Sequence, residues 1–264
     1  MLSLILCVSV LASCNDCDNK TSNTSVEYEL VGCNSAWCND LNATLSKLKV
    51  EGVFDEHFMD GYALALFDID NDGIPEIIEA EASGSSGGVL YIAYDMKTGK
   101  VEADFTGGVF HSEHSEVWCV YRDIETNTYK IIENSTTRGG STGFTRHISE
   151  LQYDTNTYEC TEKSLFSISY NIEETVVDNE LVEDTVTVYH YYNGERVTAS
   201  EYNYQYDLFI ASHIRIPETG MKLIRWVDVE DKNNPDASVN NMVEALFSSG
   251  QKFVNVIDGG ENEQ

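Results

Sequence analysis

The stretch Phe67-Asp68-Ile69-Asp70-Asn71-Asp72-Gly73-Ile74-Pro75-Glu76 combines four carboxylates and one glycine within ten residues. Counted from Asp68, the acids stand at the first, third, fifth and ninth positions, which is the spacing of a loop that wraps oxygen atoms around a calcium ion. The glycine stands at the sixth position, where such a loop turns sharply and needs a positive φ. Without a cation, four carboxylates so close together would repel one another. The sequence therefore predicts a calcium site formed by Asp68, Asp70, Asp72, Glu76 and the carbonyl of Ile74.

The segments on both sides of the loop predict strands rather than helices. Residues 62–67 and 77–81 are short apolar or alternating runs. Pro75 also stands where the second helix of an EF-hand would begin. Glu79 occupies the twelfth position, where an EF-hand has its bidentate glutamate, so Glu79 is a further candidate ligand and the loop is assigned to residues 68–79. We expect a strand, the calcium loop and a second strand.

The run from Tyr62 through Ile78 resembles the calcium-binding hairpin loops of FG-GAP and VCBS-type repeats. It is also similar to surface lipoproteins of anaerobic Gram-positive bacteria, in which such a run follows a short helical segment. The resemblance covers roughly twenty residues. It implies calcium ligands at Asp68, Asp70, Asp72 and Glu76, and it implies no known activity. Because the loop does not repeat at a fixed period, a propeller built from such repeats is not expected.

The N-terminal residues predict export. Residues 1–13 carry no charge and are mostly apolar, which is typical of a signal-peptide core and too short to span a bilayer as a mature helix. Leu11-Ala12-Ser13-Cys14 resembles the bacterial lipobox, which implies cleavage before Cys14 and lipidation of that cysteine. Because no Lys or Arg precedes the apolar run, a plain secretory signal is the alternative. We expect an extracytoplasmic protein, anchored by its lipid to the bacterial cell membrane.

The remaining chain divides into a tether and a domain. Residues 14–35 begin with a polar run without apolar periodicity and are assigned to a solvated tether. Residues 36–264 contain no Pro-rich or Gly-rich linker, so they predict a single globular domain.

The chain is strongly acidic, with 45 Asp and Glu against 16 Lys and Arg and a formal net charge of −29. A phosphate backbone would be repelled, so nucleic acid is not an expected partner. An anionic lipid surface would be repelled as well, so the expected membrane contact is the lipid anchor itself.

The cysteines allow disulfides without specifying them. If Cys14 is lipidated and the signal is removed, an odd number of cysteines remains. Cys33 and Cys38 could close a small loop, and Cys119 and Cys160 could join strands, although the sequence leaves the connectivity open. The chain has no Cys-x-x-Cys pair with matching His spacing, so a structural zinc site is not predicted.

Periodicity along the domain predicts an α+β fold that is mainly antiparallel. Apolar residues between Leu41 and Phe58 recur near helical spacing and indicate one or two short helices. From Tyr62 onward, runs rich in Val, Ile, Thr and Tyr alternate with turn signals, which predicts a β meander. A C-terminal amphipathic helix is predicted from Pro235 to about Gly250. The turn signals are Asp95–Gly99, Glu125–Asn127, Asp154–Asn156 and Asn193-Gly194.

Three other patterns are weaker candidates for a site. Residues 139–143 match the Gly-x-Ser-x-Gly nucleophile elbow around Ser141, but Phe144–Ile148 predicts a strand where the elbow needs a helix. The segment His111–Glu116 is dense in metal ligands, and a solvated loop is the alternative. Trp118, Trp226 and Tyr191-Tyr192 could form a sugar-stacking platform, or they could belong to the core.

Two classes of function follow from these patterns. The first is a non-enzymatic surface lipoprotein, a binding or accessory module with a structural calcium ion and an extracellular glycan or protein as its partner. The alternative is a secreted hydrolase that acts on a polysaccharide or peptide through Ser141 or a pair of carboxylates. His147, His190 and His213 are the candidate bases for that serine.

Overall fold

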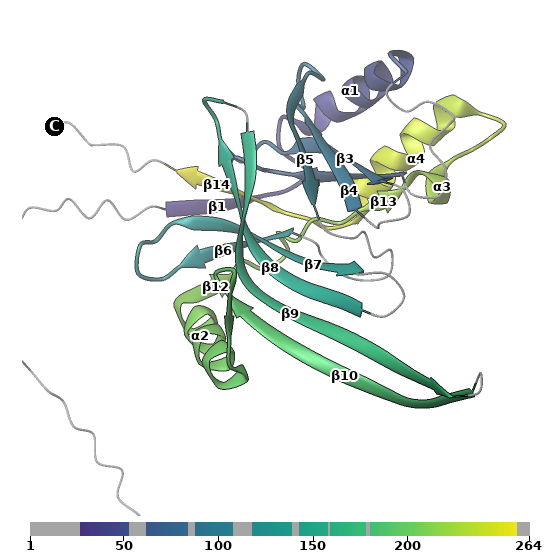
Figure 1. Cartoon of the computed structure of the whole chain (residues 1–264). Coiled ribbons are helices and arrows are strands. Elements are labelled where there is room, and N and C mark those ends of the chain that lie inside the picture. Colours follow the sequence, from purple (N-terminus) through teal and green to yellow (C-terminus); the bar gives the residue numbers. More distant parts are fainter. Residues whose placement is uncertain are drawn as a thin grey trace, which may run out of the picture.

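The computed structural model describes residues 27–52, 62–83, 88–107, 118–138, 143–157, 159–177 and 180–257. In this part of the chain, antiparallel sheets of two, five and seven strands are accompanied by a few helices. Figure 1 shows how these elements are arranged. The predicted class, an α+β fold dominated by antiparallel sheet, is confirmed. None of the helices in the described ranges combines the length and the apolar character needed to cross a membrane.

The five-stranded sheet contains the predicted calcium loop between two of its central strands. Its strands follow the order β13-β2-β3-β4-β5, so four of them form a meander. The turn signal at residues 95–99 connects β4 and β5, as predicted. The strands are β2 (Tyr62–Phe67), β3 (Glu76–Ser83), β4 (Gly88–Tyr94), β5 (Val101–Gly107) and β13 (Ile224–Arg225).

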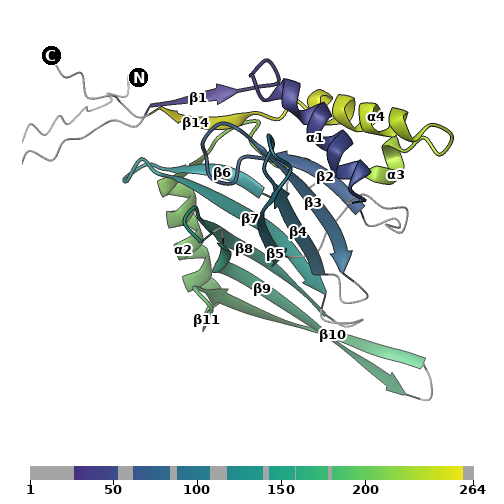
Figure 2. The same ribbon diagram turned by 90° about the horizontal axis from the view of Figure 1, so that it is seen from above.

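The seven-stranded sheet is a longer meander with the order β11-β10-β9-β8-β7-β6-β12. The three remaining predicted turn signals each connect neighbouring strands of this sheet. Asn193 and Gly194 both have positive φ, at 49° and 79°. The β9–β10 hairpin extends beyond the rest of the sheet (Figures 1 and 2). The strands are β6 (Trp118–Asp123), β7 (Tyr129–Arg138), β8 (Gly143–Asp154), β9 (Glu159–Val177), β10 (Glu180–Tyr192), β11 (Glu195–Val197) and β12 (His213–Arg215).

The two ends of the described chain pair with each other. Strand β1 (Glu27–Val31) lies antiparallel to β14 (Phe253–Ile257), with Val31 opposite Phe253. The fold therefore includes residues that the sequence assigned to the tether, and the expected domain boundary at residue 36 is too late. The pairing joins segments more than 200 residues apart, so no local pattern could indicate it.

The main core lies between the five-stranded and seven-stranded sheets. Side chains alternate along each strand, so Ala65 and Phe67 of β2 face this core while Leu64 and Leu66 face the other side. Trp118 is fully buried here, with its ring centroid 5.2 Å from that of Phe67 and 4.8 Å from that of Tyr91. Trp118 is thus a core residue and is not available as a sugar platform.

Two helices cover the opposite face of the five-stranded sheet (Figure 2). The helix α1 (Cys38–Val50) buries Leu41, Leu45 and Leu48, the spacing from which it was predicted. The predicted C-terminal helix is α4 (Pro235–Ser248), which begins after the N-cap residue Asn234. A single turn, α3 (Trp226–Val229), precedes it.

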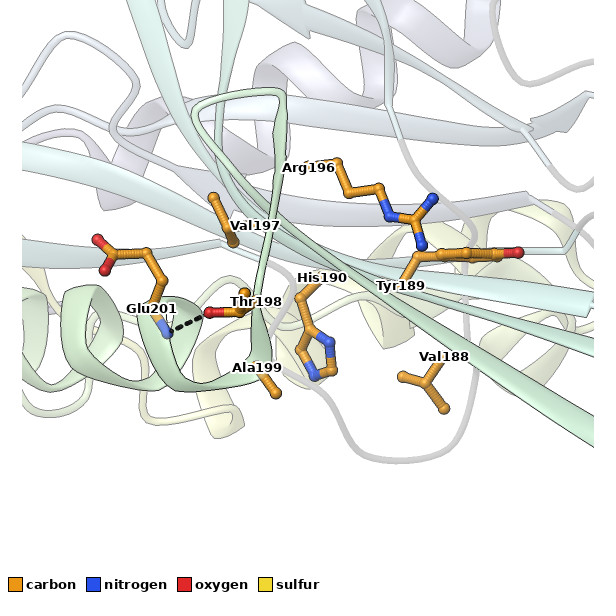
Figure 3. A pocket seen from close by; sticks show the side chains of 8 residues that line it. All are labelled: Val188, Tyr189, His190, Arg196, Val197, Thr198, Ala199 and Glu201. Carbon is orange, nitrogen blue, oxygen red and sulfur yellow. Dashed lines mark hydrogen bonds between the residues drawn. The ribbon is translucent and has the colours of Figure 1, made fainter.

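A further helix, α2 (Ala199–Ser212), covers the outer face of the seven-stranded sheet (Figure 1). The side chain of its N-cap residue, Thr198, accepts a hydrogen bond from the Glu201 N–H at 3.2 Å, as Figure 3 shows. Tyr202, Tyr206 and Phe209 pack against Phe166 of β9. The layers are therefore helices, sheet, sheet and helix, and α2 was not predicted.

Candidate metal centre

The predicted calcium loop connects β2 and β3, so the expected strand, loop and strand are confirmed. Phe67 is paired with Glu76 at the base of the hairpin. Asn71 and Gly73 have positive φ, at 61° and 85°, and this left-handed backbone turns the loop back toward β3. The chain is thus closed between residues 68 and 75 with its acidic positions gathered together.

Three aspartates converge in this loop. Asp68, Asp70 and Asp72 each contribute a carboxylate oxygen, and these oxygens all lie within 4.8 Å of one another. Asp68 is buried, whereas Asp70 and Asp72 are exposed. The set consists of hard oxygen donors without His or Cys, and such a set could hold a divalent cation.

Backbone N–H groups hold the aspartates in place. Both oxygens of Asp68 accept hydrogen bonds, Oδ1 from the Asp72 N–H at 3.0 Å and Oδ2 from the Gly73 N–H at 2.8 Å. Asp70 Oδ1 also accepts from the Asp72 N–H at 3.0 Å, and Asp72 Oδ1 accepts from the Ile74 N–H at 2.6 Å. The carboxylates are therefore oriented before any ion binds, which lowers the entropy lost on binding.

Glu76, the fourth predicted acidic ligand, is buried at the start of β3. Its Oε2 accepts a hydrogen bond from the Ile69 N–H at 2.8 Å, which fixes the carboxylate under the loop. Glu76 interacts electrostatically with Asp68 and Asp70, although it lies outside the three-residue cluster. Ile74 exposes its side chain, and its carbonyl remains a predicted ligand.

Burial dominates the electrostatics of the loop. Desolvation raises the pKa of Asp68 to about 8, with the charges of Asp70 and Asp72 adding to the rise and the Gly73 N–H opposing it. Desolvation also raises the pKa of Glu76 well above its ordinary value. The pKa of Asp72 is raised, again chiefly by burial. Among the described residues, no Lys, Arg or His forms an ion pair with these carboxylates.

Glu79 lies elsewhere. It is three residues after Glu76 on the same strand, so alternation places the two side chains on opposite faces of the sheet. The Tyr94 hydroxyl donates a hydrogen bond of 2.6 Å to Glu79 Oε2, and burial raises the pKa of this carboxyl. The structure therefore does not bring Glu79 together with Asp68, Asp70 and Asp72.

Two further acids approach the loop from the β4–β5 hairpin. Glu102 interacts electrostatically with Asp70 and Asp72, and its pKa is raised by burial first and by these neighbours and Asp95 second. Asp95 also interacts with Asp72. Neither residue was predicted as part of the site, because they join the loop through strand pairing and no local spacing marks them.

The loop is also attached to the C-terminal strand. Asp72 forms an isolated antiparallel bridge with Asn255, which lies in β14 opposite Glu29 of β1. An ion bound to the aspartates would thus hold together the β2–β3 hairpin and the strand pair that joins the ends of the described chain.

The four described cysteines are free thiols. The possible disulfide between Cys119 and Cys160 is not formed, because β7 and β8 separate their strands by at least about 14 Å and a disulfide needs Cα atoms within about 7 Å. Cys33 and Cys38 lie close together, and the Cys38 thiol donates a hydrogen bond to the Cys33 carbonyl.

The other predicted positions are only partly placed. Phe144–Ile148 belongs to β8, as expected, whereas Ser141 and the segment His111–Glu116 lie outside the described residues, as do the signal segment and Cys14. His147, His190 and His213, the candidate bases for Ser141, all lie on the seven-stranded sheet or at its strand ends.

In comparisons with known proteins, no protein-family model, no curated protein and no solved structure matches this chain.

Proposed function

We propose that the protein is a non-enzymatic binding or accessory module whose fold is stabilised by one calcium ion. The observation that carries this proposal is the closeness of the Asp68, Asp70 and Asp72 carboxylates, which accept hydrogen bonds from backbone N–H groups. Among the described residues, no Lys, Arg or His forms an ion pair with them. A bound ion would remove the mutual repulsion of these carboxylates and replace the water lost on burial.

Calcium fits the donor set better than other divalent cations. Calcium accepts six to eight oxygen ligands in flexible geometry, whereas magnesium requires a near-ideal octahedron and zinc favours His and Cys. Asp68, Asp70 and Asp72 would be ligands, with Glu76 and the Ile74 carbonyl completing the protein's share. Glu79 is bound by Tyr94 on the other face, and we leave it out of the proposed set.

The proposed role of the ion is structural. Extracellular calcium modules bind with dissociation constants of about 0.1 to 1 mM. At about 1 mM free calcium, the tighter limit stabilises the fold by about 1.4 kcal/mol through mass action. A contribution of this size fits an ion that stabilises the β2–β3 hairpin permanently at extracellular calcium concentrations. It does not fit a regulatory switch.

The location proposed for the module is the bacterial cell surface, held by a lipid on Cys14. The support for this is the sequence of residues 1–14 and the acidic composition. We propose an extracellular glycan or protein as the partner, and neither nucleic acid nor a direct lipid surface.

The proposal is tested by thermal unfolding of the purified protein in calcium and in chelator. We expect a higher melting temperature in calcium for the wild type, and for Asp70→Ala the same melting temperature in both conditions. Asp207→Ala, which removes an exposed carboxylate on α2, is the control and should keep the calcium effect. Equal melting of the wild type with and without calcium would refute the proposal.

A further inference from the structure

A pocket lies on the outer face of the seven-stranded sheet, beside α2. Its volume is about 440 Å³, within the range of about 300 to 1,000 Å³ that small-ligand sites occupy. Three strands and the helix contribute to its walls. The lining residues include Asn134, Arg146, Ile168, Tyr202, Asn203 and Tyr206.

Strand register explains how these side chains meet. Thr136, Arg146 and Ile168 stand opposite one another across β7, β8 and β9, so they form one row on the sheet. The next row contains Phe144 and Tyr170, whose rings stack with centroids 4.5 Å apart. This stacked aromatic pair therefore adjoins Arg146 on the same face of the sheet.

The charge of this pocket differs from that of the whole chain. Asp and Glu number 45 in the sequence, but none lines the pocket. Arg146 is exposed, and the described residues give it no ion pair; its guanidinium carbon lies 6.0 Å from the centroid of the Phe144 ring. A planar guanidinium in this position can bind a carboxylate through two parallel hydrogen bonds.

The other lining groups suit a sugar. Asn134 and Asn203 are exposed amides that can both donate to and accept from hydroxyl groups. Tyr202 and Tyr206 on α2 have parallel rings, at an interplanar angle of 11°; Tyr202 is buried, Tyr206 is partly exposed, and Ile168 adds apolar surface. Flat apolar faces beside amide groups match a pyranose ring, which has apolar C–H faces and a polar rim.

We propose that this pocket binds an oligosaccharide containing uronic acid, with Arg146 holding the carboxylate, Asn134 and Asn203 the hydroxyls, and the stacked pair Phe144 and Tyr170 contacting a neighbouring sugar. This inference rests on the proposed function as a binding module and gives its ligand class. The many distant carboxylates do not prevent binding, because at about 0.15 M salt charges beyond roughly 8 Å are largely screened.

A second arginine provides the matched control. Arg196 lines a neighbouring notch at the edge of the sheet, together with Tyr189 and His190 (Figure 3). Its guanidinium carbon is 4.2 Å from the centroid of the Tyr189 ring, so the Arg196 guanidinium already makes a cation–π contact. Arg146→Gln and Arg196→Gln remove the same charge from the same sheet, and only the first should affect the pocket.

The test is calorimetric titration of the full protein, in calcium and about 0.15 M salt, with short glucuronic acid oligomers and with neutral glucose oligomers of the same linkage. We expect the acidic oligomer to bind more tightly than the neutral one. Arg146→Gln should weaken its binding about tenfold or more, because a charge-assisted bidentate contact is lost. Arg196→Gln should leave the affinity within about twofold of wild type.

Three results would overturn the inference. They are no binding of the acidic oligomer by the folded wild type, equal weakening by both arginine substitutions, and equally tight binding of poly-glutamate, which would indicate an acidic peptide ligand. If Arg146→Gln does not melt like the wild type, Asn203→Ala replaces it, and unchanged affinity in that variant would also overturn the inference. Calcium titration of the same samples is independent, because loop and pocket belong to different sheets.

Discussion

The backbone of Gly73 lies directly against Asn255, so that a Cβ atom built on the glycine would be 2.7 Å from the Asn255 Cβ. Gly73 also has a φ of 85°, which other residues rarely adopt. A loop residue near the start of the domain is therefore held by a strand near its end. Both the turn and the close approach require glycine here.

The first prediction concerns this contact. Gly73→Ala should lower the free energy of unfolding by about 2 kcal/mol or more, because the strain of a positive φ is combined with a clash against Asn255, chiefly its Cβ and Cγ. Gly194→Ala is the control, since its φ of 79° is similar and no atom lies near its added Cβ; it should lose about 1 kcal/mol. Urea unfolding measures both, and equal losses would show that the contact with Asn255 does not matter.

The second prediction separates the two glutamates of β3. Glu76→Gln should weaken calcium binding about tenfold, because a buried carboxylate near Asp68 and Asp70 loses its charge. Glu79→Gln should leave the affinity unchanged, since Glu79 accepts from Tyr94 on the opposite face. Calcium titrations of the two variants check this, and a loss in Glu79→Gln would restore the twelfth-position ligand of an EF-hand.

The separation of Glu79 from the aspartate loop has a simple physical origin. In an EF-hand, the twelfth position lies on a helix that turns the glutamate back to the ion, whereas here it lies on a strand. Residues three apart on a strand point to opposite faces, so Glu76 and Glu79 cannot both face the loop. The aspartates were predictable because their spacing is local. Glu102 and Asp95 were not, because only the pairing of β3, β4 and β5 brings them near.

The third prediction concerns the N-terminus of α2. Thr198→Ala should lower the free energy of unfolding by about 1 kcal/mol, because the Glu201 N–H loses its hydrogen-bond acceptor. Thr198→Ser keeps the hydroxyl and should remain close to wild type. Chemical unfolding of both variants measures the difference, and an equal loss in Ser and Ala would exclude the cap as the cause.

The same helix shows where local sequence was informative but unused. Thr198 and Glu201 have the spacing of a capping box, and Tyr202, Tyr206 and Phe209 recur at helical intervals. Tyr and Asn have modest helix propensity and favour strands or turns, so the composition of this segment favours a continuation of the β meander. By contrast, the turn signals and the apolar spacing within α1 and α4 did predict their elements. The division of the strands into two packed sheets is non-local and could not be deduced.

The fourth prediction is a pH dependence. His147 is half-buried on β8 beside the Thr137 hydroxyl, and desolvation lowers its pKa, with the charge of Glu162 opposing the shift more weakly. Between the lowered pKa and its ordinary value of about 6.5, the unfolded chain binds more protons than the folded one, so stability falls as pH falls through this window. The free energy of unfolding of the wild type should therefore decrease relative to His147→Gln from pH 7 to pH 5. Parallel pH curves would contradict this.

The central claim is that the aspartate loop binds one calcium ion that supports the fold, and calorimetric titration of the purified protein with calcium tests it most directly. We predict one ion per chain with a dissociation constant of about 0.1 to 1 mM for the wild type, and loss of this binding in Asp70→Ala. Absence of binding in the wild type at several millimolar calcium, or equal binding by Asp70→Ala, would contradict the account.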